Sequence, residues 1–291
     1  MDIEVMDNIL EETRFILKKY NIKANKSLGQ NFLIDREAIV KIVNSAAITN
    51  EDLVIEIGPG LGTLTEFLLQ EAKKVICVEL DNKMVNILKD RFFLYKNLEI
   101  INEDILKLDI NKIIKNEKEN NQIQNVKIVA NLPYYITTPI VMKLLEEKLD
   151  IESITIMIQK EVADRLIEIP GGKNSGAITY SVNYYAIPEA ITEVPYTAFI
   201  PEPEVISKVI KLVKREEPPI KVNNEALMFK IIKCAFMQRR KTLLNALVNN
   251  GIFHDKVQGM EVLTKLEFEI NVRGEKLTLQ DYAKIANELY S

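Results

Sequence analysis

Residues 53–63 read Leu-Val-Ile-Glu-Ile-Gly-Pro-Gly-Leu-Gly-Thr, an apolar β-branched run that passes through a glycine loop into a helix-like stretch. Glycine has no side chain and accepts positive φ, so such a loop lets the backbone come close to a ligand. Thr63 stands where a dinucleotide-binding fingerprint needs its third glycine, and the loop has no Lys followed by Ser or Thr as in a phosphate loop. The stretch therefore predicts a strand, loop and helix that hold a nucleoside without a pyrophosphate.

Runs of the same kind recur along the chain and predict the sheet. The predicted strands are residues 53–57, 75–79, 98–101, 126–130 and 154–159. Because helix-length stretches separate them, we expect an α/β fold with an open, mostly parallel sheet and helices on both faces. Two later runs, 177–186 and 207–213, predict an antiparallel hairpin at the sheet edge. The polar residues 111–125 predict a solvated surface connection.

A second domain is predicted near the C-terminal end. The charged, proline-bearing stretch 214–219 interrupts the periodicity, so we place the domain boundary between residues 215 and 216. Beyond it, apolar residues recur at helical spacing, and a last helix is expected around residues 282–289. The sequence thus predicts an α/β domain over residues 1–215 and a small all-helical domain over residues 216–291.

Composition excludes several classes of protein. No run approaches 18 uncharged apolar residues, and the first thirty residues have no apolar block typical of a signal peptide, so we expect a cytoplasmic protein without a membrane span. The two cysteines, Cys77 and Cys234, lie in apolar contexts that suit a reducing compartment. His254 is the single histidine, so no zinc or iron site is expected.

Charge is distributed unevenly. The formal net charge of −4 argues mildly against a nucleic-acid binder. However, residues 14–34 hold five basic residues and no acid, and residues 226–253 again hold five and no acid. Each cluster is either a solvated helix face or a contact for phosphate.

Two acidic residues follow at the ends of the next predicted strands. Glu79 lies nineteen positions after Gly60, and Asp104 ends the third run. A carboxylate at the tip of the second strand can accept hydrogen bonds from both ribose hydroxyls. Asp104, or the backbone beside it, can accept a hydrogen bond from an adenine amine. A carboxylate at a strand end is often only a helix cap, but the ordered set of glycine loop, Glu79 and Asp104 favours a nucleoside site.

The most specific stretch, Asn131-Leu132-Pro133-Tyr134, follows the fourth predicted strand. An adenine amine is a poor nucleophile because its lone pair is delocalised into the ring. Two acceptors aimed at the amine hydrogens favour a pyramidal nitrogen and free the lone pair. The side-chain oxygen of Asn131 and the carbonyl of Leu132 can supply them, while Pro133 makes the turn rigid. Tyr134 can stack on a flipped base. The alternative is a structural proline turn with buried tyrosines.

The order of motifs resembles the small-subunit (16S) ribosomal RNA adenine dimethyltransferases of the KsgA type. The matching stretches are residues 26–33, 56–62, 79, 104, 131–134, 159–165, 198–203 and 238–242. They are collinear and span nearly the whole chain, from Lys26 to Leu277. The resemblance implies a Rossmann-like class I methyltransferase domain followed by a helical domain that contacts RNA.

The resemblance also implies site residues. The cofactor would be S-adenosylmethionine, contacted by Asn31, Leu33, Gly58, Glu79, Asp104 and Asn131. The target adenine would lie between Tyr134 and Phe199, and RNA phosphate would contact Arg239, Arg240 and Lys241. The implied reaction is dimethylation of two adjacent adenosines in a hairpin loop near the 3′ end of 16S ribosomal RNA, within the immature small subunit. A monomer is the default expectation.

Four positions depart from the family pattern: Glu204, Ile206, Ser175 and Ala177. These positions bear on RNA contacts and loop packing, and they leave the predicted pockets intact. Two alternative functions stay open at this point. One is an Erm-type enzyme acting on large-subunit (23S) RNA, against which Leu132 and the 238–242 block stand. The other is a ribosome-assembly checkpoint factor whose methylation is secondary.

Overall fold

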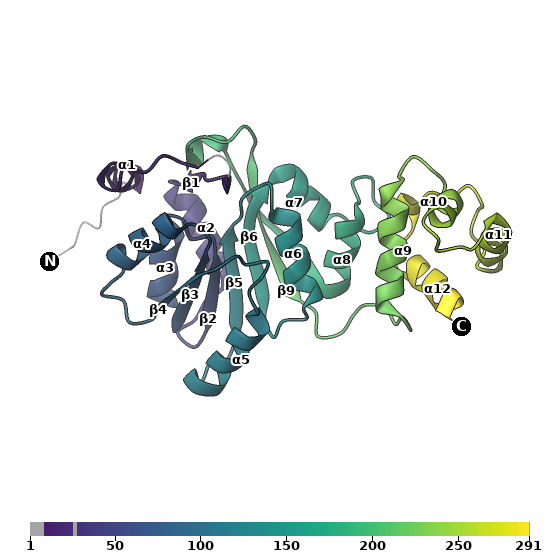
Figure 1. Ribbon diagram of the computed structural model, residues 1–291, viewed down its shortest axis with the longest axis horizontal. Coiled ribbons are helices and arrows are strands. Elements are labelled where there is room, and N and C mark those ends of the chain that lie inside the picture. Colours follow the sequence, from purple (N-terminus) through teal and green to yellow (C-terminus); the bar gives the residue numbers. More distant parts are fainter. Residues whose placement is uncertain (1–8, 26–27, 291) are drawn as a thin grey trace. The chain divides into compact units, whose positions relative to one another are not determined.

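The five predicted strands up to residue 159 form the parallel part of a seven-stranded sheet (Figure 1). The computed structural model describes residues 9–25 and 28–290. The parallel strands are β2 (Leu53–Ile57), β3 (Lys74–Glu79), β4 (Leu98–Asn102), β5 (Val126–Asn131) and β6 (Ser153–Gln159). β9 (Ser207–Lys214) pairs antiparallel with β6, and β7 (Ala186–Val194) lies beside β9 at the edge. The expected mostly parallel sheet with an antiparallel edge is confirmed.

The sheet order β4-β3-β2-β5-β6-β9-β7 places the functional region. β2 and β5 are parallel neighbours, but the chain adds β3 and β4 on one side of β2 and then β5 and β6 on the other. In such sheets ligands bind beyond the carboxyl ends of the strands at this switch point. The flanking helices of this part are α2 (Arg36–Ala46), α3 (Thr63–Glu71), α4 (Asn82–Arg91), α5 (Ile110–Asn121), α6 (Thr137–Glu146) and α7 (Lys160–Ile167). At the N-terminal end, α1 (Ile9–Lys19) precedes β1 (Phe32–Leu33), which pairs with β8 (Phe199–Ile200).

Two predicted segments are wrong. Residues 177–186 were expected as a strand, but α8 (Ala177–Tyr185) is a helix, and the edge strand is β7 instead. The residues of α8 have high strand propensity, yet Tyr180 and Tyr184 stand one helical turn apart and are buried together in a hydrophobic core. Tertiary packing overrides local propensity here. The expected surface connection 111–125 is mostly the helix α5, capped by Asp109 and buried along Ile110 and Ile114.

Contacts divide the chain into two compact units. The first runs from the N-terminal end to Ala163 and includes Glu189–Lys214, and the second comprises Asp164–Pro188 and Arg215 to the C-terminal end. The second unit holds α8, α9 (Glu225–Met237), α10 (Leu243–Asn249), α11 (Lys256–Lys265) and α12 (Leu279–Tyr290). Residues 164–188 thus group with the C-terminal helices, whereas the sequence placed them in the first domain, because the α8 tyrosines pack into the helical core.

Short 3-10 turns complete the fold at Tyr196–Ala198 and Gly274–Lys276. Within the described ranges, none of the helices has the length and apolar character needed to cross a membrane.

Candidate active site

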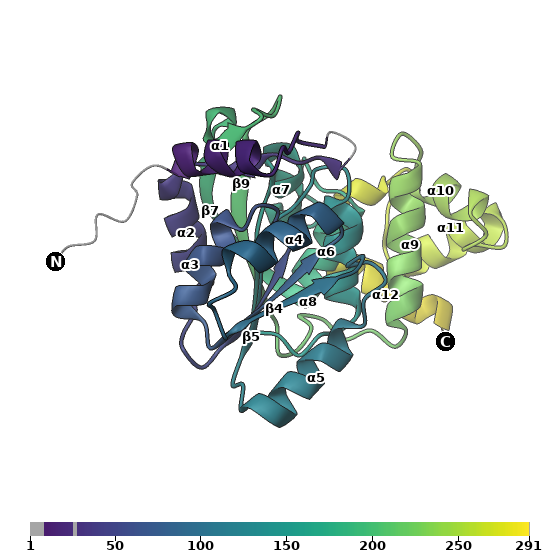
Figure 2. The same cartoon turned by 60° about the vertical axis from the view of Figure 1, so that its left-hand side comes forward.

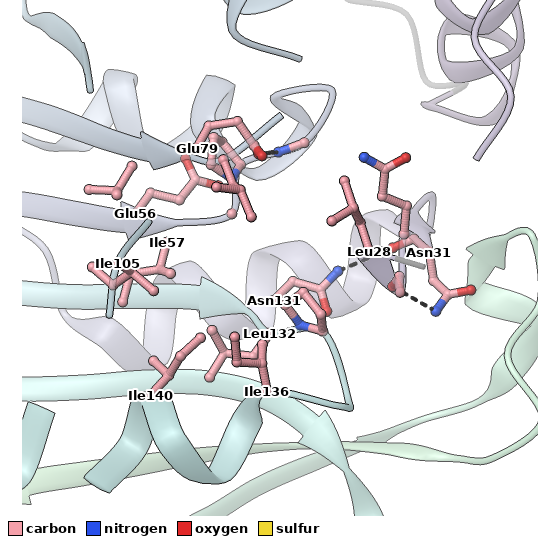
Figure 3. A pocket seen from close by; sticks show the side chains of 18 of the residues that line it. Leu28, Asn31, Glu56, Ile57, Glu79, Ile105, Asn131, Leu132, Ile136 and Ile140 are labelled. Atoms are coloured by element: carbon pink, nitrogen blue, oxygen red, sulfur yellow. Dashed lines mark hydrogen bonds between the residues drawn. The ribbon is translucent and has the colours of Figure 1, made fainter. Parts of the chain in front are cut away.

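A cavity opens at the carboxyl ends of β2, β3, β4 and β5 in the first unit (Figure 3). Its walls come from the segment before and in β1, the glycine loop, the two acidic ends of β3 and β4, and the loop after β5. The lining residues are 28–33, 56–61, 63–64, 78–80, 103–105, 131–136 and 140. The predicted residues Asn31, Leu33, Gly58, Glu79, Asp104, Asn131 and Tyr134 are therefore brought together, although 103 positions separate the first from the last (134 − 31).

The glycine loop has the backbone form that the sequence suggested. Gly58, Gly60 and Gly62 have φ of 68°, 57° and 85°, in the left-handed region that favours glycine. Gly62 also needs to lack a side chain, since a Cβ there would lie 2.5 Å from the Phe92 ring. The Gly62 amide donates to the Pro59 carbonyl at 2.9 Å and closes the turn. The loop thus exposes backbone to the cavity while α4 supports it from behind.

Glu79 is held at the tip of β3 by two backbone amides. Its carboxylate accepts hydrogen bonds from the Gly60 amide at 3.1 Å and the Asp81 amide at 2.8 Å. Burial raises the pKa of Glu79, and these two bonds oppose the shift. The carboxylate is therefore fixed in position before any ligand binds, with its remaining lone pairs free to accept hydroxyl groups.

Glu56 is a buried acid of the cavity to which the sequence had assigned no role. Its carboxyl accepts from the Thr65 hydroxyl at 2.6 Å and lies 3.5 Å from the Cys77 sulfur. Burial raises its pKa to about 7, and the Thr65 bond opposes the shift. The sequence signal for Glu56 was an acid inside the otherwise apolar run Leu53–Ile57, because burying an unpaired charge costs free energy and therefore marks a residue with a specific role.

Asp104 lies two residues after the end of β4, half-buried and on the cavity wall. Its carboxylate accepts from the Leu106 amide at 2.9 Å, which shapes the turn after β4. The apolar side chain of Ile105 follows it into the wall. This part of the wall therefore offers an acceptor and an apolar surface side by side.

The segment before β1 closes another side of the cavity. The Asn131 side-chain amide donates to the Asn31 backbone carbonyl at 3.4 Å, and the Asn31 side-chain amide donates to the Gly29 carbonyl at 3.3 Å (Figure 3). Leu33 is buried beside them. Lys26 and Ser27, which belong to the same motif, lie outside the described residues.

Gln30 is a lining residue whose role the sequence did not reveal. Its side chain donates to the Asp81 carboxylate at 3.0 Å and accepts from the Asn25 amide at 2.9 Å. Gln30 and Asp81 are 51 residues apart, so no local pattern could have found the pair. The bond ties the N-terminal segment to the residue that also holds Glu79.

The loop after β5 is anchored at both ends. The Leu132 amide donates to the Met157 carbonyl at 3.1 Å, and the Thr137 hydroxyl donates to the Pro133 carbonyl at 3.1 Å. Half-buried Tyr134 shares a hydrogen bond of 2.7 Å with the Ser207 hydroxyl at the start of β9. Burial raises the pKa of Tyr134. The Asn131 side-chain oxygen accepts no hydrogen bond from the described residues, so an acceptor is available in the cavity.

The structure does not bring Phe199 to the cavity. Its side chain is 1% exposed and lies in the hydrophobic core, and its backbone pairs with Leu33. A ring in this position cannot stack on a base without becoming exposed. The sandwich of adenine between Tyr134 and Phe199 therefore lacks one side in this conformation.

Arg239, Arg240 and Lys241 lie in the second unit, exposed between α9 and α10. Arg239 forms an ion pair with Glu275 at 3.4 Å. Of the four departures from the family pattern, Ser175 is fully buried and its hydroxyl donates to the Gly172 carbonyl at 2.8 Å. None of the four is among the cavity-lining residues of the described chain.

A mostly parallel sheet, a glycine loop after its first parallel strand and carboxylates at the tips of the next two define a Rossmann-like methyltransferase that uses S-adenosylmethionine. Residues 21–290 match the family model described as ribosomal RNA adenine dimethylase. The chain belongs to this family.

Relatives and solved structures agree with this membership. The chain is 47% identical over 279 residues, 96% of each chain, to "Ribosomal RNA small subunit methyltransferase A" of Alkaliphilus oremlandii. It is 48% identical to the protein of that name from Lachnoclostridium phytofermentans, over 95% of each chain. Among solved structures it is similar to a dimethyladenosine transferase from Plasmodium falciparum, with a TM-score of 0.74, 26% identity, and coverage of 89% of this chain and 97% of that one.

Proposed function

We propose that this enzyme transfers methyl groups from S-adenosylmethionine to the exocyclic amines of two adjacent adenosines near the 3′ end of 16S ribosomal RNA. Each adenosine is dimethylated, in a hairpin loop of the immature small subunit. The observation that carries the proposal is the meeting of Asn131 and Tyr134 with Glu79 in one cavity of a chain whose relatives are named for the small-subunit RNA. We place the enzyme in the cytoplasm as a monomer.

The cavity fits the cofactor by its donors and acceptors. The fixed Glu79 carboxylate suits two ribose hydroxyls, and Asp104 beside Ile105 suits an adenine ring. We assign the methionine end to the region of Asn31, Leu33, Gly58 and Asn131. When bound there, S-adenosylmethionine supplies a methyl group on a positively charged sulfur.

The chain's own residues then act on the target amine. The Asn131 oxygen and the Leu132 carbonyl accept hydrogen bonds from this amine and favour a pyramidal nitrogen whose lone pair is free. Pro133 keeps both acceptors in place because its ring restricts the turn. Tyr134 stacks on the base, with its ring oriented by the bond to Ser207. Phe199 can form the second side of the stack only if its ring leaves the core.

The function is tested by primer extension and nucleoside mass spectrometry on ribosomal RNA from cells with and without the gene. We expect dimethyladenosine to disappear from the small-subunit RNA when the gene is absent. Loss of methylation from the large-subunit RNA instead would contradict the proposal and support the Erm-type alternative.

Replacing Glu79 with Gln is expected to weaken S-adenosylmethionine binding tenfold or more. The ribose hydroxyls lose a charged acceptor, and hydrogen bonds to charged groups contribute about 1.5 to 3 kcal/mol each. Calorimetry on the folded variant measures the change. Glu71→Gln, which removes an equal charge from an exposed site at the end of α3, is the control. Unchanged affinity in Glu79→Gln removes this residue from the site.

Replacing Arg239 and Arg240 together with Ala should lower RNA affinity and flatten its salt dependence. Each lost phosphate contact reduces the slope of log affinity against log salt by about 1. Filter binding to a transcript of the small-subunit 3′ end at several salt concentrations gives the slope. Lys256→Ala with Lys284→Ala removes the same charge from exposed positions of the same unit. If both double variants keep the wild-type slope, Arg239 and Arg240 are only solvated.

A further inference from the structure

The N-terminal helix α1 is fastened to the rest of the first unit along one side. Ile16 packs in a buried cluster with Phe32, Leu61 and other residues. Glu12 forms an ion pair with Arg91, and Lys19 forms one with Asp90 at 3.0 Å. These contacts hold α1 beside α4 and fix which side of the helix faces solvent (Figures 1 and 2).

The opposite side of α1 carries cations around an exposed aromatic ring. Lys18 stands four residues after Arg14 and three after Phe15, so the three side chains lie on one face of the helix, called the stripe here. Phe15 is 64% exposed, and both basic side chains are exposed as well. Lys23, just after the helix, is also exposed. None of these three cations forms an ion pair within the described residues.

One acid lies on this face of the helix. Glu11 is exposed and stands three residues before Arg14 and four before Phe15, whereas Glu12 pairs with Arg91 on the opposite side. From Arg14 to Ile34 the sequence has no acid at all. The stripe of Arg14, Phe15, Lys18 and Lys23 therefore stays positive, because its three cations outnumber the single acid Glu11.

A hydrogen bond links the end of the stripe to the rim of the cavity. Two residues after Lys23, the Asn25 backbone amide donates to the side chain of Gln30, which lines the cavity, at 2.9 Å. Arg91, which holds Glu12, also donates to the carbonyl of Leu61 in the glycine loop. A nucleic-acid strand whose base enters the cavity must have its neighbouring nucleotides on such a rim.

We propose that the stripe of Arg14, Phe15, Lys18 and Lys23 binds the single-stranded RNA next to the nucleotide that is methylated. The three cations contact phosphates, and Phe15 stacks on an unpaired base, as in other single-strand sites that combine cations with aromatic rings. A single exposed ring among cations offers too little apolar surface for a stable protein partner. This inference rests on the proposed function and adds a contact surface in the first unit.

The test removes the charge of the stripe and compares it with equal charge removed elsewhere. The variant is Arg14→Gln, Lys18→Gln and Lys23→Gln, and the matched control is Lys41→Gln, Lys73→Gln and Lys115→Gln, three exposed residues of the same unit. Filter binding to a transcript of the small-subunit 3′ hairpin is measured from low to moderate salt. We expect the stripe variant to bind tenfold or more weakly at low salt, with a slope lower by about 2. The control should stay within about twofold of wild type.

Phe15 is tested separately because stacking does not depend on salt in the same way. Phe15→Ala should bind the transcript roughly fivefold more weakly with an unchanged salt slope, and Phe15→Tyr, which keeps the ring, should bind as wild type does. Calorimetry with S-adenosylmethionine and thermal unfolding confirm that each variant is folded with an intact cofactor site.

Two results overturn the proposal. One is a stripe variant with the affinity and salt slope of wild type. The other is an equal loss in the control, which means that net charge alone matters. Methyl transfer by the wild-type enzyme to the same transcript and to undermethylated small subunits tests the proposed function independently. If wild type methylates them and the stripe variant binds normally, only the stripe is excluded.

Discussion

Asn131→Ala is expected to slow methyl transfer at saturating cofactor and RNA by a hundredfold or more. Asn131 is the last residue of β5, and its side-chain amide donates to the Asn31 carbonyl at 3.4 Å. Its side-chain oxygen accepts no hydrogen bond from the described residues. In the proposed mechanism that oxygen is needed most when the target nitrogen becomes pyramidal, so we expect its loss to raise the barrier more than it weakens binding. Removing one preorganised polar group from a dry site typically costs about 2.7 to 4 kcal/mol.

The measurement is single-turnover transfer of labelled methyl to undermethylated small subunits, with folding and cofactor affinity checked separately. Tyr134→Ala is the contrast, because losing a stacking platform costs about 1 to 3 kcal/mol of base binding and should weaken RNA capture. A near-wild-type rate for Asn131→Ala at saturation would falsify the mechanism in which Asn131 polarises the amine.

Lys127→Met should lower the free energy of unfolding by about 3 to 5 kcal/mol. Lys127 lies on β5 near the end of the sheet opposite the cavity, and its side chain is 4% exposed. Its ammonium donates to the Asp52 carboxylate at 2.9 Å and to the Ala47 carbonyl. The Asp52 side chain is fully buried, so removing Lys127 leaves a buried carboxylate that keeps the bond from the Thr49 amide but loses its ion-pair partner.

Urea unfolding of the cofactor-free protein at neutral pH gives the difference. Lys41→Met, which removes an exposed lysine paired with Glu37 one turn away, should change stability by less than about 0.5 kcal/mol. Adding Asp52→Leu to Lys127→Met should restore most of the loss, since a buried pair can often be replaced by apolar residues. A loss below 1 kcal/mol in the single variant would show that Asp52 finds another partner.

The same pair sets the sign of a pH effect. Burial by itself would raise the pKa of Asp52, but hydrogen bonds from Lys127 and Thr49 outweigh it and hold this pKa below its ordinary value of 3.8. A carboxyl with a lowered folded-state pKa stabilises the fold fully above its unfolded pKa. The contribution is therefore present above about pH 4 and is lost as the pH falls through the folded-state pKa. Lys127→Met should make unfolding less sensitive to pH in that range.

The predictions from sequence succeeded where a local pattern carries the physics. The five parallel strands were found because a strand buried on both faces reads as a short apolar run between turn residues. The glycine loop was found because positive φ at Gly58, Gly60 and Gly62 selects glycine itself. Glu79, Asp104 and Asn131 were predicted to lie together because they stand at or shortly after the ends of such runs, and they line one cavity because parallel strands end at one edge.

Tertiary structure alone decided the features that depend on residues far apart in the chain. The segment Ala177–Tyr185 is a helix because its tyrosines pack into the helical core, against the propensity of its own residues. Phe199 lies in the core, because β8 pairs with β1 more than 160 positions earlier (199 − 33 = 166). The bonds that fix Glu79 to Gly60, Gln30 to Asp81 and Lys127 to Asp52 join residues 19, 51 and 75 positions apart. A sequence determines which groups are available and how each short segment prefers to fold, but hydrogen bonds and packing act through space, so only the folded chain determines which groups meet.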